Sequence, residues 1–399
     1  MEMLKLVVVF AGIMIFIRKP LWFAISVGVV IAVLIFRIPF FTSLSLAKKA
    51  VTSWDTVSLV LAFYTITFVQ RMMESRKMIK TAEVAVDNLF NSKRITCMLT
   101  PFVIGLLPAA GAVLIAAPIV ENAAGDNLSV PEKTFVTSYF RHISEAFMPT
   151  YSGILLALQL SKVDMTKFVL GMLPMMACLF ALGYIFYIRK IPKIETAPKK
   201  SDKGEDVKNF CLGLWPIIVT IIIVLTTHIA VYKAVIPVIV VLAFTRKFSL
   251  KEILPFFRTA FESKQIVNTI IIMIFKELLT YTGIIGRMPG YFSKLPVPTV
   301  VIFGIIFLVV PIVSGSQATI ALALPLAYAA MPNGGLPLMI FLMCLVYIAM
   351  QMSPTHVCLA IVVERFKVSF IDLVRKTVPV ALSFIAICSV YSYLLYFIG

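Results

Sequence analysis

The amino-acid sequence predicts an all-α polytopic membrane protein composed of two inverted-topology repeats. Composition is the first observation, because 60% of the 399 residues are hydrophobic and the mean hydropathy is +1.00, whereas soluble domains are about 45–50% apolar. Apolar runs of roughly 15–25 residues recur along the chain, and about 20 such residues cross a hydrocarbon core as a helix. A soluble core could not bury them all, so we expect many membrane crossings.

Helix-breaking prolines that recur at a fixed spacing are the second observation. Three motifs of the first half reappear 205 positions later: Pro149-Thr150 as Pro354-Thr355, Lys162-Val163 as Lys367-Val368, and Pro174 as Pro379. Only six of the 26 positions from 149 to 174 are identical at this spacing, so chance similarity is the alternative. The matched element order and the charge distribution favour a repeat. Interrupted helices in corresponding places of two halves point to a transporter's binding site.

The first repeat is expected at 1–188, with scaffold helices in 1–94 and a hairpin and broken helix in 95–188. Its elements are predicted as helices at 4–17, 21–36 and 54–72, an amphipathic surface helix from Arg76 to Arg94, a re-entrant hairpin at 95–120, a crossing at 134–159 broken at Pro149, and a crossing at 164–188. The hairpin is predicted because Pro101, Pro108 and Gly111 interrupt an apolar segment.

A hydrophilic linker is expected at 189–208, and the second repeat at 209–399. Scaffold helices are expected in 209–298, and a hairpin and broken helix in 299–399. The predicted elements are crossings at 210–228, 234–245 and 265–283, a surface stretch at 287–298, a broken apolar segment at 299–330, a crossing broken at Pro354, and a last crossing at 370–397.

Charge is the third observation. The formal net charge is +17, but Lys and Arg lie in short loops between apolar segments, which is typical of cytoplasmic loops and not of a nucleic-acid-binding domain. The 71–94 stretch has six basic residues and its counterpart 286–298 has two, so we expect the first inside and the second outside. Counting crossings places the linker inside and both termini outside the cytoplasm, with the two halves in opposite orientations.

Several function classes are disfavoured by missing motifs. The six cysteines are scattered without CxxC or Cys/His spacing, so neither disulfides nor a zinc site is indicated. His142-x-x-Glu145 lacks the second histidine of HExxH, and no nucleotide-binding or GxSxG motif is present. The N-terminal apolar segment lacks a small-residue cleavage site and is predicted to be a retained helix. We expect no enzymatic activity, no metal and no cofactor, with Na⁺ or H⁺ as the coupling ion.

Two hairpin tips are the first candidate binding elements. They comprise Pro108, Ala109, Ala110 and Gly111 in the first half, and Ser314, Gly315, Ser316 and Gln317 in the second. Small residues allow close approach, and Gly and Pro leave backbone groups unpaired. The half-helices after the tips, with Thr319 in the second, present N–H groups suited to an anion. Ordinary proline kinks packed by small residues are the alternative.

The breaks in the two interrupted crossings are the second candidate elements. They comprise Pro149, Thr150, Tyr151 and Ser152, and Ser353, Pro354, Thr355 and His356. Hydroxyls and an imidazole offer hydrogen bonds where water is scarce. Thr150 and Thr355 occupy equivalent places, so we expect both to face a central cavity. The alternative for Ser152 and Ser353 is a bond to the carbonyl four residues earlier in their own helix.

Glu145, His142 and His356 are the candidates for ion coupling. Arg141 and Glu145 are four residues apart and are predicted to pair on one helix face. Ionisable groups within the membrane are functional candidates, but a structural pair near the cytoplasmic surface is the alternative. His356 could titrate near neutral pH and couple protons, or it could act as a neutral donor to the solute.

Three segments resemble domain-of-unknown-function family 401, a group of prokaryotic membrane proteins in the ion-transporter superfamily, near gluconate permeases and divalent-anion/sodium symporters. They are GLLPAAGAVLIAAP (105–118), YFRHISEAFMP (139–149) and MSPTHVCLAIVVERF (352–366). The resemblance spans nearly the whole chain. It implies a homodimer in the prokaryotic inner membrane, with a scaffold and a moving transport domain. Two opposed hairpins and two unwound helices would then hold the solute in an elevator-type motion.

One departure from the superfamily bears on specificity. Its carboxylate/sodium symporters carry Ser-Asn-Thr at each tip, and neither tip here does, so dicarboxylate specificity and sodium coupling are not implied. The sequence favours a secondary active transporter of a small polar, anionic organic solute, coupled to Na⁺ or H⁺. A channel or facilitator is one alternative, and a lipid or precursor flippase is another. A membrane-embedded enzyme or accessory subunit is a third.

Overall fold

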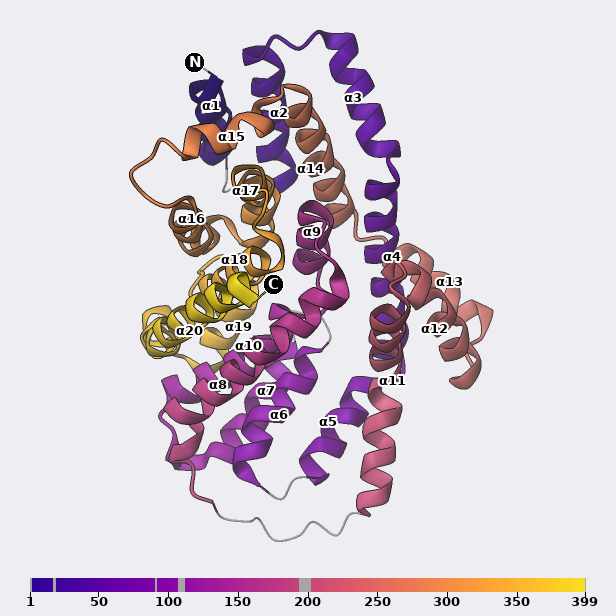
Figure 1. Cartoon of the computed structure of the whole chain (residues 1–399). Coiled ribbons are helices and arrows are strands. Elements are labelled where there is room, and N and C mark those ends of the chain that lie inside the picture. The colour runs from indigo at the N-terminus through magenta and orange to yellow at the C-terminus, as the bar shows by residue number, and fades with distance from the viewer. Residues whose placement is uncertain (1, 17–18, 90–91, 107–111, 194–201, 399) are drawn as a thin grey trace.

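The computed structural model describes residues 2–16, 19–89, 92–106, 112–193 and 202–398, and every regular element in these ranges is a helix (Figure 1). The first half contains α1 (Glu2–Ile15), α2 (Leu21–Ile35), α3 (Phe40–Thr52), α4 (Trp54–Ser75), α5 (Met78–Leu89), α6 (Lys93–Gly105), α7 (Ala112–Ala124), α8 (Val130–His142), α9 (Ser152–Ser161) and α10 (Met165–Phe186). Single 3₁₀ turns lie at Gly125–Asn127, Ile143–Ala146 and Ile188–Lys190.

The second half contains ten α-helices in a matching order. They are α11 (Lys203–Thr227), α12 (Val231–Thr245), α13 (Leu250–Thr259), α14 (Ser263–Tyr281), α15 (Ile284–Phe292), α16 (Thr299–Ser314), α17 (Ser316–Ala330), α18 (Gly335–Met350), α19 (Val357–Phe366) and α20 (Phe370–Ile398). Contacts between the halves are reciprocal: α2 packs against α14 as α12 packs against α4, and α9 packs against α17 as α19 packs against α7.

The two halves also match at the ends of individual helices. Helices α9 and α19 both have ten residues and both end at a lysine in the left-handed conformation, with φ of 60° at Lys162 and 53° at Lys367. The same ending follows α2 and α12, where φ is 54° at Arg37 and 50° at Lys247. A left-handed residue after the last turn lets the following N–H groups bond to the last free carbonyls. Basic side chains at this place also face the negative end of the helix dipole.

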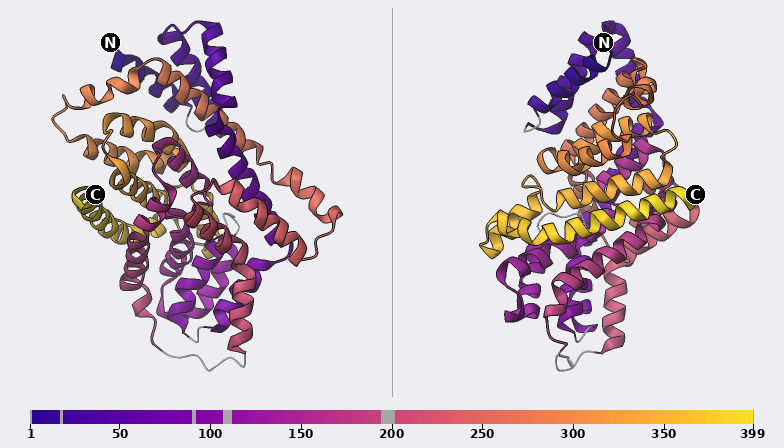
Figure 2. Two further views of the ribbon diagram at one scale, coloured as in Figure 1. Left: turned by 45° about the vertical axis from the view of Figure 1, so that its right-hand side comes forward. Right: turned by 60° about the vertical axis from the view of Figure 1, so that its left-hand side comes forward.

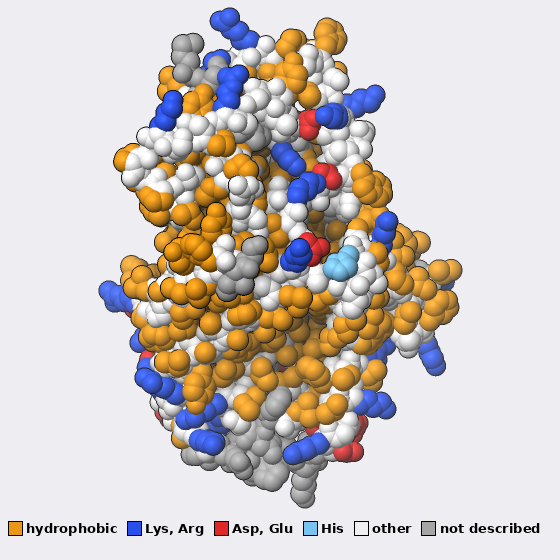
Figure 3. Space-filling model, in the orientation of Figure 1, with side chains coloured by type: hydrophobic (Ala, Val, Ile, Leu, Met, Phe, Trp, Pro, Cys, Tyr) orange, Lys and Arg blue, Asp and Glu red, His pale blue; other side chains and the backbone are white. Residues whose placement is uncertain are grey.

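Four helices are long and apolar enough to cross a membrane: Trp54–Ser75, Met165–Phe186, Lys203–Thr227 and Phe370–Phe397. A fifth span results if α14 and α15 are counted as one bent segment, and the other apolar helices have 10–17 residues. Hydrophobic side chains cover a broad middle region of the face in Figure 3, and Lys and Arg lie at both its upper and its lower end. This is a multi-pass membrane protein by the length and composition of its helices.

Four features differ from the sequence-based expectation. Helices α3 and α13 were not predicted, because both are short and mix apolar with polar residues. Helix α11 begins at Lys203, inside the expected linker, where Asp202 caps it by accepting a hydrogen bond from the Gly204 N–H. The break expected at Pro149 begins earlier, at the 3₁₀ turn Ile143–Ala146.

The amphipathic helix α5 is the fourth difference. Its apolar face packs against α11, and a Cβ atom at Gly213 of α11 would lie 2.6 Å from the Ala82 Cβ. The amphipathic pattern is therefore explained by contact with another helix of the same chain, in addition to any contact with lipid.

The two halves enclose a buried centre formed by the broken helices and hairpins. Helices α10 and α20 lie side by side across the middle of the molecule, as the right-hand view of Figure 2 shows. Helix α6 contacts α7 and α8, and α16 contacts α17 and α18. In both halves, the first arm of a hairpin therefore packs beside the helix that leads into the break.

The left-handed lysines give a matched pair of variants. Lys367→Gly should raise the apparent melting temperature in detergent, because the left-handed conformation costs an L-residue about 1–2 kcal/mol and costs glycine almost nothing. Part of this gain is lost because glycine increases the backbone entropy of the unfolded chain. Lys162→Gly should gain less, because Lys162 Nζ lies 2.6 Å from Asp55 Oδ2. Thermal unfolding followed by size-exclusion chromatography measures both. Equal gains in both variants would contradict this view of Lys162.

Gly105 gives a second prediction, because it is the closest approach of α6 to α8. A Cβ atom there would lie 1.9 Å from the Arg141 carbonyl oxygen, which is backbone and cannot move aside cheaply. Gly105→Ala should lower folded yield and thermal stability by the equivalent of roughly 1–3 kcal/mol, as expected of overpacking. Gly290→Ala in α15 is the control, because no atom lies within 4 Å of the added carbon. Equal stability of the two variants would show that α6 and α8 can separate.

Candidate functional site

A cavity of about 480 Å³ lies where both helix breaks meet the second hairpin tip. We call it the central cavity. Its wall is formed by the end of α8, both breaks, the first turns of α9, α17 and α19, and one face of α18. The lining residues are Arg141, Glu145, 151–154, Ser316, Gln317, Ile320, Met343, Val346, Tyr347, Met350, Gln351 and 355–358. Segments about 200 positions apart in the chain thus form one wall.

The first break is held by hydroxyls that bond to the end of α6. Pro149 lacks an N–H and disfavours helical backbone at the residue before it, so the chain leaves the helix between α8 and α9. Ser144 Oγ donates to the Gly105 carbonyl over 2.6 Å, and the Tyr151 hydroxyl donates to the same oxygen. The carbonyl that α6 leaves unpaired at its end is therefore satisfied by the broken helix.

The second break repeats this arrangement with different residues. Ser353 Oγ donates to the Ile312 carbonyl of α16 over 2.7 Å and lies 2.8 Å from Thr355 Oγ1. Helix α16 is the counterpart of α6, so each break satisfies a carbonyl of its own half's hairpin. The alternative of a bond within the serine's own helix does not hold for Ser353.

The second hairpin tip turns at Gly315, whose φ of 83° and ψ of 162° belong to backbone that only glycine adopts readily. Gln317 Nε2 donates to Ser152 Oγ over 2.7 Å, which joins this tip to the break of the other half. Ser314 Oγ donates to the Val310 carbonyl of α16, and Thr319 Oγ1 donates to the Gly315 carbonyl. Neither residue lines the central cavity. The bond that Ser152 makes is therefore to the other half, and not to the carbonyl four residues earlier in its own helix.

The first hairpin tip, with Pro108, Ala109, Ala110 and Gly111, lies outside the described residues. Its two arms, α6 and α7, contact each other as α16 and α17 do. Among the break prolines, Pro149 is buried and Pro354 is exposed, and neither lines the central cavity.

Thr150 and Thr355 do not share one cavity, contrary to the sequence-based expectation. Thr355 lines the central cavity, whereas Thr150 lines a second cavity of about 440 Å³ with Gln70, Arg71 and Glu262. The bond from Tyr151 to Gly105 turns Tyr151 and Ser152 inward, and Thr150 then faces α4. Tyr151 and Ser152 line both cavities and separate them.

The charged candidates form one cluster at the end of α8. Arg141 is 1% exposed, and its Nη1 lies 2.7 Å from Glu145 Oε1, which confirms the predicted pair. The His142 and His356 rings lie edge to face, with their centroids 4.6 Å apart. Glu145 and His356 line the central cavity, while His142 is fully buried behind it.

Three residues of this wall were missed by sequence reasoning. The Tyr347 hydroxyl and Gln351 Nε2 are buried and make no hydrogen bond within the described residues, although both side chains line the central cavity. Cys358 lies in the first turn of α19 beside both histidines. Tyr347 and Gln351 are four residues apart just before Pro354, so a polar face on an apolar helix was the available signal.

Helix termini add a positive field. Helices α9, α17 and α19 begin at Ser152, Ser316 and Val357, and all three residues line the central cavity. The first N–H groups of a helix have no partner within it and carry partial positive charge. The site can therefore hold an anion by backbone groups, with side-chain amides and hydroxyls to fix its orientation.

Comparison with known proteins gives a family and several similar solved structures. No curated protein matches. The YdaH transporter of Alcanivorax borkumensis, described as having an unusual topology, is similar in structure over 90% of this chain and 88% of its own, with 13% identity and a TM-score of 0.49. The family model described as "Protein of unknown function (DUF401)" matches residues 2–396. The chain therefore belongs to the DUF401 family.

Proposed function

We propose that this protein is a secondary active transporter of a small polar, anionic organic solute. The observation that carries the proposal is the central cavity, in which two interrupted helices and a hairpin tip meet inside an apolar helical protein. Interrupted helices expose backbone groups that bind ions and solutes, and they are tolerated at membrane depth where they line a cavity. The proposed coupling ion is Na⁺ or H⁺.

The chemistry of the wall favours an anion. The first residues of three helices line the cavity, and anions bind readily at helix N-termini. Tyr347 and Gln351 offer donors without partners in the described residues. A buried donor left without a partner costs about 1–3 kcal/mol, so a solute oxygen that accepts these bonds gains affinity.

The positions of the two cavities support the proposal of an elevator-type motion. Every residue of the central cavity belongs to 95–188 or 299–399, the regions proposed as the transport domain. The second cavity lies between that domain and the proposed scaffold, since Thr150 faces Gln70 and Glu262 there. A binding site that lies wholly in one domain can move together with that domain. A cavity at the boundary between two domains leaves room for one domain to slide along the other. Inverted halves, external termini and a homodimer remain parts of this proposal.

A channel or facilitator with the same architecture is one alternative, and a flippase is another. An apolar cavity of about 700 Å³ lies among α16, α18 and α20. It belongs to one region of the second half and does not run between the two proposed domains. The flippase therefore gains no specific support from it.

The test of transport is uptake into proteoliposomes. A panel of labelled organic anions should include one that accumulates under an imposed Na⁺ or H⁺ gradient and leaks out when the gradient is collapsed. Uptake that equilibrates without accumulation under either gradient would favour the facilitator. No uptake of any anion in the panel would contradict the proposed function.

Gln317 and Thr355 provide a mutational test of the site. Gln317→Ala removes the donor to Ser152, and Thr355→Val removes a hydroxyl from the cavity wall. Each should lower initial uptake by up to about tenfold, as expected from the loss of one hydrogen bond of about 0.5–1.5 kcal/mol. The measurement is initial uptake normalised to folded protein in the liposomes. Thr226→Val is the control, because its hydroxyl bonds to its own helix at Ile222. Full activity of both variants would place the solute elsewhere.

Cross-linking tests the motion. Asp55 of α4 and Lys162 at the end of α9 form an ion pair of 2.6 Å across the proposed domain boundary. Cysteines at both places, in a chain without other cysteines, should be joined by a flexible thiol reagent that a reductant cleaves. Uptake should fall on cross-linking and return on reduction. Unchanged uptake in fully cross-linked protein would contradict sliding at this boundary.

A further inference from the structure

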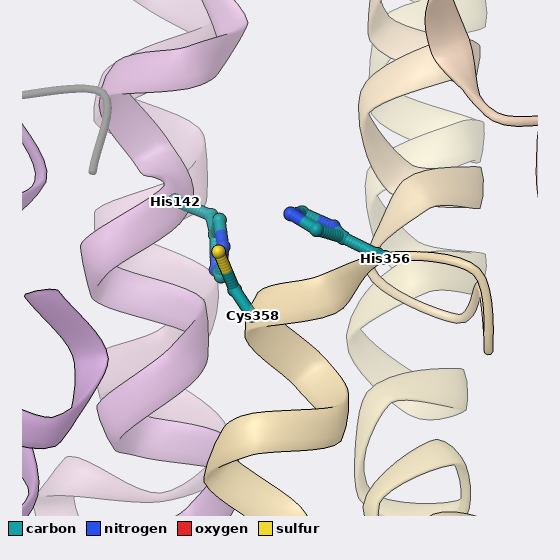
Figure 4. Close-up of side chains that lie close together, drawn as sticks. All are labelled: His142, His356 and Cys358. Carbon is teal, nitrogen blue, oxygen red and sulfur yellow. The ribbon is translucent and has the colours of Figure 1, made fainter. Parts of the chain in front are cut away.

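Two histidines and a cysteine from the two halves meet beside the central cavity (Figure 4). His142 ends α8, His356 precedes α19, and Cys358 lies in the first turn of α19. One ligand atom from each, a ring nitrogen or the sulfur, lies within 4.8 Å of the other two. His142 lies more than 200 positions before the other two residues, so no local spacing of Cys and His could reveal the group of three.

Hydrogen bonds fix which nitrogen of each ring is free. His142 Nδ1 lies 2.6 Å from the Ser138 carbonyl oxygen, and His356 Nδ1 lies 3.3 Å from the Met350 carbonyl oxygen. A carbonyl only accepts, so Nδ1 carries the hydrogen and Nε2 keeps its lone pair. Histidines that bind metals almost always donate their other ring N–H in this way.

The free nitrogen of His142 is the strongest sign of a ligand. His142 is 0% exposed, and its Nε2 makes no hydrogen bond within the described residues. An unpaired polar atom in such surroundings calls for a partner. The Figure 4 view shows this ring, the His356 ring and the Cys358 sulfur facing a common space.

We propose that His142 Nε2, His356 Nε2 and Cys358 Sγ bind a transition-metal ion of the Zn²⁺ class. Imidazole and thiolate select Zn²⁺, Co²⁺ or Cu⁺ and not Na⁺, Mg²⁺ or Ca²⁺, which prefer oxygen. Tetrahedral bonds of about 2.0–2.3 Å require ligand atoms roughly 3.3–3.8 Å apart. The ligand atoms lie up to 4.8 Å apart, so side-chain rotations must bring them about 1 Å closer together when the metal binds.

Charge and access complete the site. Metal binding releases the Cys358 proton to solvent, and the resulting thiolate offsets one positive charge. Glu145 Oε1 lies 3.8 Å from His142 Nε2 and is paired with Arg141. The Glu145 carboxylate therefore attracts a metal ion at this site, and the positive charge of Arg141 offsets part of that attraction. His356 and Cys358 line the central cavity, so the fourth position of the metal faces it. Metal binding here does not require transport, and it goes beyond the proposed function.

The test is metal binding by purified full-length protein in detergent, prepared with a tag that contains no histidine. The background is Cys211→Ser, which removes the exposed thiol. After chelator treatment and its removal, Co²⁺ should bind at one equivalent, with a thiolate-to-cobalt charge-transfer band in the near ultraviolet and the visible bands of a tetrahedral ion. Added Zn²⁺ should displace it.

Variants separate this site from adventitious binding. Cys358→Ser should abolish the charge-transfer band, and His356→Gln should weaken binding by about 100-fold or more, since even groups that only orient a ligand are worth 10–100-fold. His228→Gln, at an exposed histidine outside the group, is the control and should bind as the background does. Chromatographic profile and helical circular dichroism verify folding of each variant.

Two results would overturn the proposal. One is a background protein that binds no stoichiometric Co²⁺ or Zn²⁺. The other is a charge-transfer band that persists in folded Cys358→Ser protein. Both readouts are independent of uptake, so failure of the metal site and failure of the proposed transport are distinguishable.

Discussion

The structure depends on satisfying the backbone groups that its broken helices release. A carbonyl without a partner is costly where water is excluded, yet each hairpin and each break frees several. The chain meets this constraint in the same way twice: hydroxyls of Ser144 and Tyr151 bond to Gly105, and Ser353 bonds to Ile312. The breaks and hairpins of each half are therefore fixed to one another, and the central cavity is the space that remains between them.

The same constraint explains why the two halves match more closely in helix lengths and helix ends than in their side chains. Helices α9 and α19 have equal lengths and equal left-handed endings, although none of their ten aligned residues is identical. Apolar residues exchange freely in packed helices, whereas the prolines at the breaks and the left-handed positions recur at the same places in both halves. Conserved geometry with exchanged side chains also lets the halves differ in chemistry, as Tyr151 and His356 show at their respective breaks.

The sequence predicted the helical class, the two breaks and the second hairpin, because proline and glycine act locally on the backbone. It predicted the Arg141–Glu145 pair for the same reason, since spacing along a helix is local. It did not predict α3 and α13, whose mixed composition gives no hydropathy signal. It also misplaced Thr150, because which way a residue faces within a break depends on the bond of its neighbour Tyr151 to α6. The meeting of His142 with Cys358 depends on how the halves pack, which no spacing along the chain encodes.

The bond between Gln317 and Ser152 has a consequence for how the cavity is closed. It is a neutral contact across the two halves, and such a bond is worth about 0.5–1.5 kcal/mol net. That energy corresponds to at most about a tenfold preference for the bonded arrangement. The bond alone therefore does little to hold the tip against the first half, and the packing of α17 against α9 supplies most of that contact.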